Sequence, residues 1–182
     1  MAVAIGIKND VQLKAIQAAA VLHDTGKIAI PESILNKPGP LTKDEFEVMK
    51  QHAAMGADII SSVNFPYPVE PIVRYHHENW DGSGYPEGLI GTDIPIGARI
   101  LSVVDCFDAL TSDRPYRLSL SDAEAIEILL KRRGNMYDPL VVDTFLKVHK
   151  QLTPTARPAD TRQASISVPD VALSLSAEPS PN

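Results

Sequence analysis

The chain has 182 residues, enough for one domain with an appendage, and its 44% hydrophobic content is sufficient for a core. Its 17 basic and 23 acidic residues give a net charge of −6, which argues against broad binding to nucleic acid. The single cysteine, Cys106, excludes an internal disulfide and a multi-cysteine zinc site. No apolar run approaches the roughly 18 residues of a membrane span, and the start lacks the basic residues of a secretion signal. We therefore expect a cytoplasmic protein that neither enters a membrane nor binds nucleic acid.

The apolar pattern predicts an all-α fold. A first helix is expected from Asp10 to about His23, where apolar residues recur at mostly helical spacing, and Gly26 is expected to break it. A loop rich in proline and glycine follows. Thr42 then begins a second helix, because Glu45 three residues later completes a Thr-x-x-Glu capping box.

The middle of the chain contains a third helix, a long loop and a fourth helix. Pro71 is a good first-turn residue for a helix that runs to the pair His76-His77. Residues 79–95 are rich in glycine and form a long loop, and such loops are usually functional or disordered. Residues 96–111 are apolar enough to form a buried helix.

The last part of the chain contains two helices and a tail. Ser121 and Glu124 form a second capping box, and Gly134 ends the helix that follows. Pro139 begins a last helix that runs to about Leu152. Residues 153–182 are rich in proline, serine and alanine and lack aromatic residues, so we expect a disordered tail. The predicted domain therefore covers residues 1–152.

Six side chains along these helices form a pattern typical of a metal site: His23, Asp24, His52, His76, His77 and Asp105. Taken singly, His23-Asp24 is also compatible with a solvated helix end, and His52 with a core histidine. A pair of imidazoles, or a carboxylate inside an apolar helix such as Asp105, is costly without a partner. The two oxygens of Asp24 suit a bridge between two metals, which lie roughly 3.5–4 Å apart in such sites. Imidazole and carboxylate ligands without thiolate favour iron, manganese, zinc or nickel.

Four further residues fit the recognition of a phosphate ester. Lys27 is either a solvated loop lysine or, beside a metal pair, a group that holds a phosphate oxygen or protonates a leaving group. Arg114 and Arg117 are either solvated charges or a clamp, since guanidinium forks match phosphate oxygens. Tyr85 either stacks on a base or packs within the glycine-rich loop.

In order and spacing, these residues resemble the HD-GYP family, a branch of the HD metal-dependent phosphohydrolases. The resemblance extends roughly from Lys8 to Lys147. Its motifs are His23-Asp24-Thr25-Gly26-Lys27-Ile28, Lys37-Pro38-Gly39-Pro40-Leu41, His52 with Gly56, His76-His77-Glu78, Asp81-Gly82-Ser83-Gly84-Tyr85-Pro86, Gly88-Leu89, Ala98-Arg99-Ile100, Asp105-Cys106-Phe107-Asp108-Ala109-Leu110, Arg114-Pro115-Tyr116-Arg117 and Asp138-Pro139.

The resemblance implies an HD-type helical bundle that holds two or three divalent ions, with iron or manganese expected and zinc, nickel or magnesium as alternatives. It also implies a phosphodiesterase that hydrolyses cyclic di-GMP, a bacterial second messenger, to linear pGpG or GMP. The implied metal ligands are the six residues of the pattern, and Asp24 and Lys27 are the implied catalytic residues. The implied substrate contacts are Lys27, Tyr85, Arg114 and Arg117.

One feature of the family is not matched. Its members normally carry another histidine ligand on a helix before the His-Asp helix, and residues 1–22 contain no histidine or glutamate. We therefore expect the first helix of the domain to be missing, which would expose apolar surface and favour a homodimer.

This difference motivates an alternative to the enzyme, namely an impaired domain that binds cyclic dinucleotides or other proteins. Hydrolysis of a related substrate, such as a hybrid cyclic dinucleotide, is a third hypothesis. The partners expected from the resemblance are the cyclic dinucleotide and a sensor, receiver or GGDEF-type domain.

Overall fold

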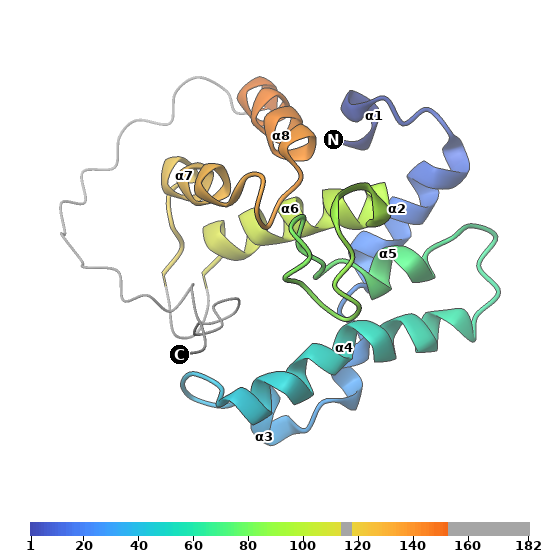
Figure 1. Ribbon diagram of the computed structural model, residues 1–182, viewed down its shortest axis with the longest axis vertical. Coiled ribbons are helices and arrows are strands. Elements are labelled where there is room, and N and C mark those ends of the chain that lie inside the picture. Colours follow the sequence, from blue (N-terminus) through green and yellow to red (C-terminus); the bar gives the residue numbers. More distant parts are fainter. Residues whose placement is uncertain (114–117, 153–182) are drawn as a thin grey trace.

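The computed structural model describes residues 1–113 and 118–152, and over these residues the chain is helical, without a strand (Figure 1). The predicted all-α class is thereby confirmed. The elements are α1 (Ala2–Ile5), α2 (Asp10–Leu22), η1 (Thr25–Ala29), α3 (Glu32–Leu35), α4 (Lys43–Ser61), α5 (Glu70–Arg74), η2 (Gly91–Asp93), α6 (Ile96–Thr111), α7 (Asp122–Arg132) and α8 (Pro139–Leu152). The predicted tail, and the predicted clamp of Arg114 and Arg117, lie outside the described residues.

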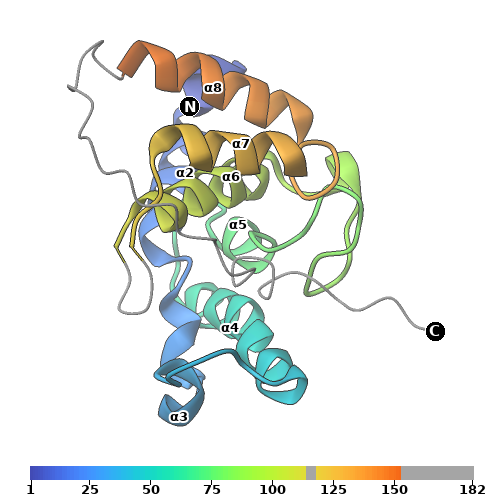
Figure 2. The same cartoon turned by 90° about the vertical axis from the view of Figure 1, so that its left-hand side faces the viewer.

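Helix α6 is the centre of the bundle, because both of its sides are buried. On one side Ala98 and Leu101 pack with residues of α2, α4 and α5 in a first core. On the other side Ile100 and Val103 join a second core with α7, α8 and the residues around α1. Figure 2 shows the resulting order, with α8 and α7 above α6 and with α4 on the opposite side. A helix buried on both sides at this position explains why residues 96–104 are apolar except for Arg99 and Ser102.

The helix starts were predicted well, because local side-chain caps define them. Asn9 accepts backbone N–H bonds at the start of α2, and both predicted capping boxes are present, at Thr42 for α4 and at Ser121 for α7. Helix α8 begins at Pro139 as expected. None of the described helices combines the length and the apolar character needed to cross a membrane.

Three details of the sequence-based prediction were wrong. The short helices α1 and α3 were not expected, since four-residue helices carry little periodicity. Helix α5 ends at Arg74, so His76 and His77 lie in the turn that follows rather than on the helix. Helix α2 ends at Leu22, and Gly26 lies inside the next element, η1, instead of terminating α2.

Gly26 allows the backbones of η1 and α4 to approach each other closely. A Cβ at this position would lie 1.9 Å from the backbone oxygen of His52 and 2.5 Å from the backbone nitrogen of Gly56, so only glycine fits. This contact places η1 directly against the backbone of α4. Residues adjacent to Gly26 are thereby held beside the middle of α4.

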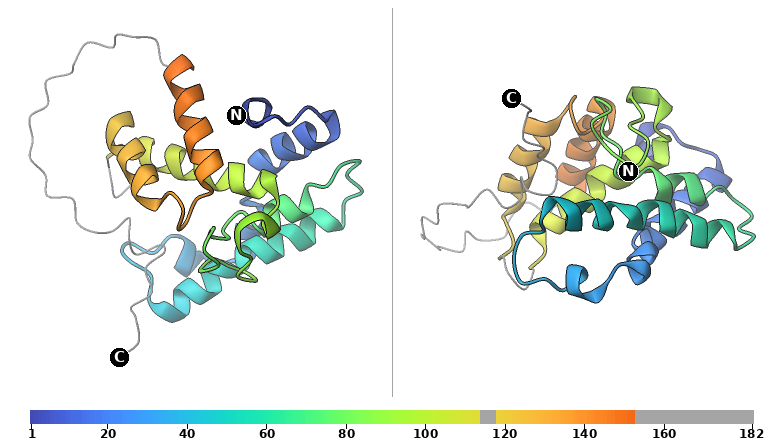
Figure 3. Two further views of the ribbon diagram at one scale, coloured as in Figure 1. Left: turned by 45° about the horizontal axis from the view of Figure 1, so that its top comes forward. Right: turned by 60° about the horizontal axis from the view of Figure 1, so that its bottom comes forward.

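The long loop of residues 79–95 folds back over the bundle, between α5 and α6 in sequence (Figure 3). It reaches α4, where the ring of Tyr85 lies edge-on to that of Phe46 at 6.4 Å. Hydrogen bonds from Trp80 and Asp81 N–H groups to the carbonyls of Met136 and Asn135 attach it to the turn before α8. The predicted loop is therefore ordered and joined to both halves of the fold.

We expect Gly26→Ala to destabilise the protein by roughly 3 kcal/mol or more, the upper end of the overpacking range, because the new methyl group would meet backbone atoms. Gly97→Ala in α6 is the matched control. Its Cβ would lie 2.6–3.0 Å from side-chain atoms of Ile72 and Ile16, which can shift where a backbone cannot, and alanine suits a helix better, so we expect a smaller loss of roughly 1–2 kcal/mol. Urea unfolding measures both, and equal losses would contradict the close-approach role.

Candidate metal centre

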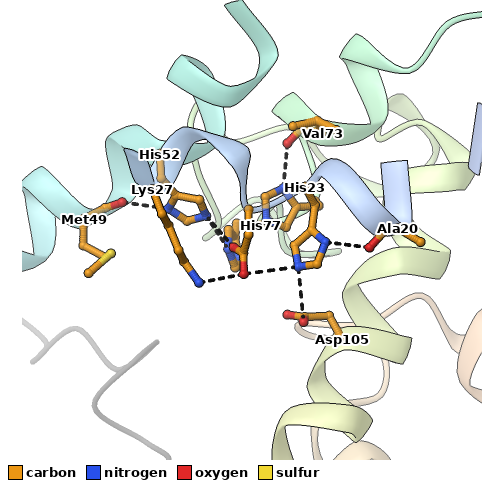
Figure 4. A network of polar contacts seen from close by, with 10 residues as sticks. Ala20, His23, Lys27, Met49, His52, Val73, His77 and Asp105 are labelled. Carbon is orange, nitrogen blue, oxygen red and sulfur yellow. Dashed lines mark hydrogen bonds and ion pairs between the residues drawn. The ribbon is translucent and has the colours of Figure 1, made fainter. Parts of the chain in front are cut away.

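The six residues of the predicted metal site converge from four separate segments of the chain. His23 follows the last residue of α2, and Asp24 precedes η1. His52 lies in the middle of α4, the pair His76-His77 follows α5, and Asp105 lies on α6. Figure 4 shows the polar groups of His23, His52, His77 and Asp105 facing one another. The geometry therefore groups residues that are as many as 82 positions apart in sequence.

Three of the four histidines are oriented by a backbone carbonyl three residues earlier. The Nδ1 atoms of His23, His52 and His76 lie 3.0, 2.8 and 2.6 Å from the carbonyl oxygens of Ala20, Met49 and Val73. A carbonyl only accepts, so each Nδ1 carries a proton, and in the neutral ring Nε2 then presents a lone pair. This bond is the usual outer partner of a metal-ligating histidine, because it fixes both ring orientation and tautomer.

The Nε2 atoms point toward a common centre. His52 Nε2 lies 3.2 Å from His77 Nε2, and one ligand nitrogen each from His52, His76 and His77 fall within 4.8 Å of one another. Two lone pairs so close repel unless a proton or a cation lies between them. The Nε2 of His76 is fully buried without a hydrogen-bond partner, which is costly for a polar atom. A transition-metal ion would satisfy these nitrogens, and the residues present therefore fit a metal.

The carboxylate of Asp24 faces both sides of the centre. Its Oδ1 lies 3.8 Å from His52 Nε2, while its Oδ2 lies 3.6 Å from His23 Nε2. Lys27 donates a hydrogen bond to the same Oδ2 at 2.8 Å. Asp105 Oδ1 lies 3.5 Å from His23 Nε2 on the other side. One oxygen therefore lies toward each histidine, a disposition compatible with the bridging role of Asp24, which stays a prediction.

The charge states of His52, His76 and His77 suit metal binding, since a ligating imidazole must be neutral, whereas His23 is shifted the other way in the metal-free chain. Burial lowers the pKa of His76 to about 4, and burial also lowers the pKa of His52 and, more strongly, that of His77. The hydrogen bond with Asp105 raises the pKa of His23. Burial alone would raise the pKa of the Asp105 carboxyl, but the hydrogen bond and charge of His23 outweigh it and lower the pKa.

The centre is closed on its histidine side and open on its carboxylate side. The His52 side chain is 3% exposed, whereas the side chains of Asp24, Lys27 and Asp105 are 46%, 39% and 37% exposed. Among the residues that the structure describes, the carboxylates and the lysine are the most exposed groups of the centre, so an approaching ligand would meet them first. A charged oxygen of that ligand would meet the Lys27 ammonium at this opening.

Tyr85 closes another part of the site. Its ring stacks on that of His77 with centroids 4.9 Å apart and an angle of 26° between the planes. The Lys50 ammonium lies 5.7 Å from the centroid of the Tyr85 ring. This stacking supports the loop-packing alternative for Tyr85, and a contact between Tyr85 and a substrate stays a prediction.

The sequence interpretation missed one residue next to the site. Glu78 follows the histidine pair directly and is buried, with its carboxylate bonded to the glycine-rich loop. The sequence did contain a signal. Glu78 is acidic, and it stands between the histidine pair and a glycine-rich loop whose backbone N–H groups need acceptors. Only the fold shows that this loop returns to Glu78.

The HD domain family matches residues 2–141 of the chain. The chain belongs to the HD domain family. It is 47% identical over 151 residues to a cyclic di-GMP phosphodiesterase of Thermotoga maritima, covering 82% of this chain and 41% of that protein. It is 46% identical over 150 residues to a cyclic di-GMP phosphodiesterase response regulator of Xanthomonas campestris, covering 81% of this chain and 39% of that protein. The chain thus spans about two fifths of the length of these curated relatives.

Among solved structures, an HD-GYP protein of Bdellovibrio bacteriovorus matches this HD domain with a TM-score of 0.64 at 22% identity, covering 82% of this chain and 47% of that chain. At this identity the likeness concerns the fold alone. Together with the high-identity relatives, it confirms the resemblance to the HD-GYP branch that the motifs indicate.

We expect His52→Ala to weaken the binding of Mn²⁺ or Zn²⁺ by more than about 100-fold, since losing a ligand should exceed the 10–100-fold effect of its outer partners. The fifth histidine provides a matched control. His149 contacts Asp122 between α8 and α7, so His149→Ala should bind metal like the unmodified chain. Calorimetry on chelator-treated protein measures both affinities, and equal affinities of the two variants would contradict the proposed ligand.

In the metal-free protein, stability should fall as the pH falls from 6.5 to 4. The pKa of His76 is about 4 in the folded state and 6.5 when the residue is unperturbed, so the unfolded chain binds more protons in this window. This difference amounts to roughly 3 kcal/mol for His76 alone. Urea unfolding across the window should show a shallower pH slope for His76→Gln than for His149→Gln. The same slope in both variants would show that His76 is not buried and neutral.

Proposed function

We propose that this chain is the phosphodiesterase unit of a protein that hydrolyses cyclic di-GMP to pGpG or GMP in bacterial second-messenger signalling. The observation that carries the proposal is the convergence of one ring nitrogen each from His52, His76 and His77 with the two-sided carboxylate of Asp24, beside the ammonium of Lys27. The relatives named above, which are cyclic di-GMP phosphodiesterases, support the same substrate class.

The proposed metal ligands are the six residues of the centre: His23, Asp24, His52, His76, His77 and Asp105. When bound there, two or three divalent ions, iron or manganese by preference, would polarise the phosphate and supply a water nucleophile at neutral pH. The protein's contribution is orientation, since its backbone carbonyls set three of the four imidazole rings. The absence of thiolate at the centre supports iron or manganese over metals that prefer sulfur.

Lys27 is the proposed phosphate contact of the described chain. Its ammonium is bonded to Asp24 at the open side of the centre and is 39% exposed, so it can reach an incoming anionic oxygen while it stays on Asp24. Positive charge at this position would stabilise the negative charge that develops on the phosphate oxygens. Arg114 and Arg117, expected as a clamp, complete the proposed set of cations.

The proposed catalytic domain comprises residues 1–152, since the family match ends at residue 141 within α8 and that helix continues to Leu152. A sensor, receiver or GGDEF-type domain is the proposed partner, because the matched relatives are more than twice as long as the matched region and one of them is a response regulator.

Manganese- or iron-loaded protein should convert cyclic di-GMP to pGpG or GMP. Asp24→Ala should abolish turnover, and Lys27→Met should reduce it by about 10²–10³-fold, the effect of removing one preorganised charge stabiliser. Lys50→Met is a matched control for loss of a nearby ammonium that is bonded to Glu47 instead of Asp24. Anion-exchange chromatography of the products measures all three.

The same assay with 3'3'-cGAMP identifies the preferred substrate, since other relatives of 36–42% identity are named as phosphodiesterases specific for that dinucleotide. A metal-loaded chain that binds both dinucleotides and cleaves neither would overturn the proposed activity.

A further inference from the structure

His77 differs from the other three histidines in how its ring is held. The rings of His23, His52 and His76 each bond a backbone carbonyl through Nδ1. Within the described residues, the hydrogen-bond contact of the His77 ring is made through Nε2 instead, to His52. A ligating imidazole needs a second contact to fix its orientation, so something other than a carbonyl must hold His77.

Tyr85 makes that second contact. Its ring stacks on His77 at 4.9 Å, while the His52 ring lies edge-on to His77 at 5.0 Å. Besides the ring of its neighbour His76 at 4.0 Å, the His77 ring thus contacts one ring from α4 and one from the glycine-rich loop. An offset stack of this kind limits rotation of the imidazole about its side-chain bonds.

The loop can place Tyr85 there only by returning to the histidine pair. The N–H of Tyr85 donates to the carbonyl of His77 at 3.2 Å. Gly84 passes so close that a Cβ would lie 2.5 Å from Cα of Glu78 and 2.2 Å from the backbone nitrogen of Asn79. The backbone of residues 84–85 therefore lies against the backbone of residues 77–79.

The carboxylate of Glu78 binds the backbone of the loop a few residues further on, at residues 87–89. Its Oε1 accepts the N–H groups of Glu87 and Gly88 at 2.7 and 3.0 Å, and its Oε2 accepts that of Leu89 at 3.0 Å. The residue is only 2% exposed, and a buried carboxylate is tolerated when hydrogen bonds of this kind satisfy its oxygens. These three bonds join residues 87–89 to Glu78 and so restrain the loop segment that contains Tyr85.

We infer that Glu78 is a positioning residue of the metal centre: it fixes the glycine-rich loop so that Tyr85 stacks on His77 and aims His77 Nε2 at the metal. The inference rests on the proposed metal-dependent function. It deepens that function by assigning the loop the role that a backbone carbonyl has for the other three histidines.

Metal affinity tests the inference without reference to turnover. In Glu78→Gln the amide nitrogen cannot accept, so the carboxamide loses either the Leu89 bond or both of the others. We expect Mn²⁺ or Co²⁺ affinity to fall by about 10–100-fold, as for other outer-sphere changes, with an altered Co²⁺ absorption spectrum. Tyr85→Leu, which removes the stack and leaves the Glu78 bonds in place, should give a similar loss, whereas Tyr85→Phe should not.

A double-mutant cycle separates positioning from general stability. If Glu78 acts through Tyr85, Glu78→Gln in the Tyr85→Leu background should lower metal affinity less than about 3-fold further. Glu87→Gln is the matched control, because this carboxylate belongs to the same loop but bonds the Tyr75 hydroxyl; it should bind metal normally. Circular dichroism of each metal-free variant confirms that the protein tested is folded.

Several outcomes would overturn the inference. These are an unchanged metal affinity in folded Glu78→Gln, an unchanged affinity in Tyr85→Leu, or fully additive losses in the double variant. Should Glu78→Gln fail to fold, the Tyr85→Leu and Tyr85→Phe pair still decides, because those variants keep the carboxylate. Normal metal binding without hydrolysis of cyclic dinucleotides would reject the proposed activity and leave the positioning result interpretable.

Discussion

The backbone contact between η1 and α4 is the constraint on which the rest of the site depends. Gly26 lies against the carbonyl of His52 and the nitrogen of Gly56, at a distance that no side chain permits. Because η1 packs directly on the backbone of α4, the flanking residues Asp24 and Lys27 lie in front of His52. A short element of five residues could not position two charged side chains by its own stability.

Helix α6 supplies the opposite wall of the site and links it to the rest of the bundle. The two cores on its sides fix its position, so Asp105 reaches the centre from a helix that is buried on both sides. Packed cores transmit small displacements rather than absorb them. Substitutions in either core should therefore shift the position of Asp105. The ion pair of Arg99 with Asp138, at 2.7 Å, connects the start of this helix to the start of α8.

The histidines show two solutions to one physical problem. A ligating ring must be held in one orientation, and three rings use a carbonyl of their own segment while His77 uses a ring and a loop. The local solution follows from the helical or turn geometry around each residue. The second solution depends on Glu78 and a backbone that returns from residues 84–89, so it links the order of the loop to the order of the metal centre.

The sequence by itself determined the helical class, most helix starts and the chemical types at the site, because capping boxes, apolar periodicity and the cost of burying imidazole and carboxylate are properties of short segments. Two predictions of helix ends were wrong: Gly26 does not terminate α2, and α5 does not extend to His76. Helix ends depend on neighbours that are distant in the chain. Only the tertiary structure decided which nitrogen of each ring faces the centre, why Gly26 must be glycine, and that Glu78 closes the loop. Those features are distances between segments, and sequence spacing does not contain them.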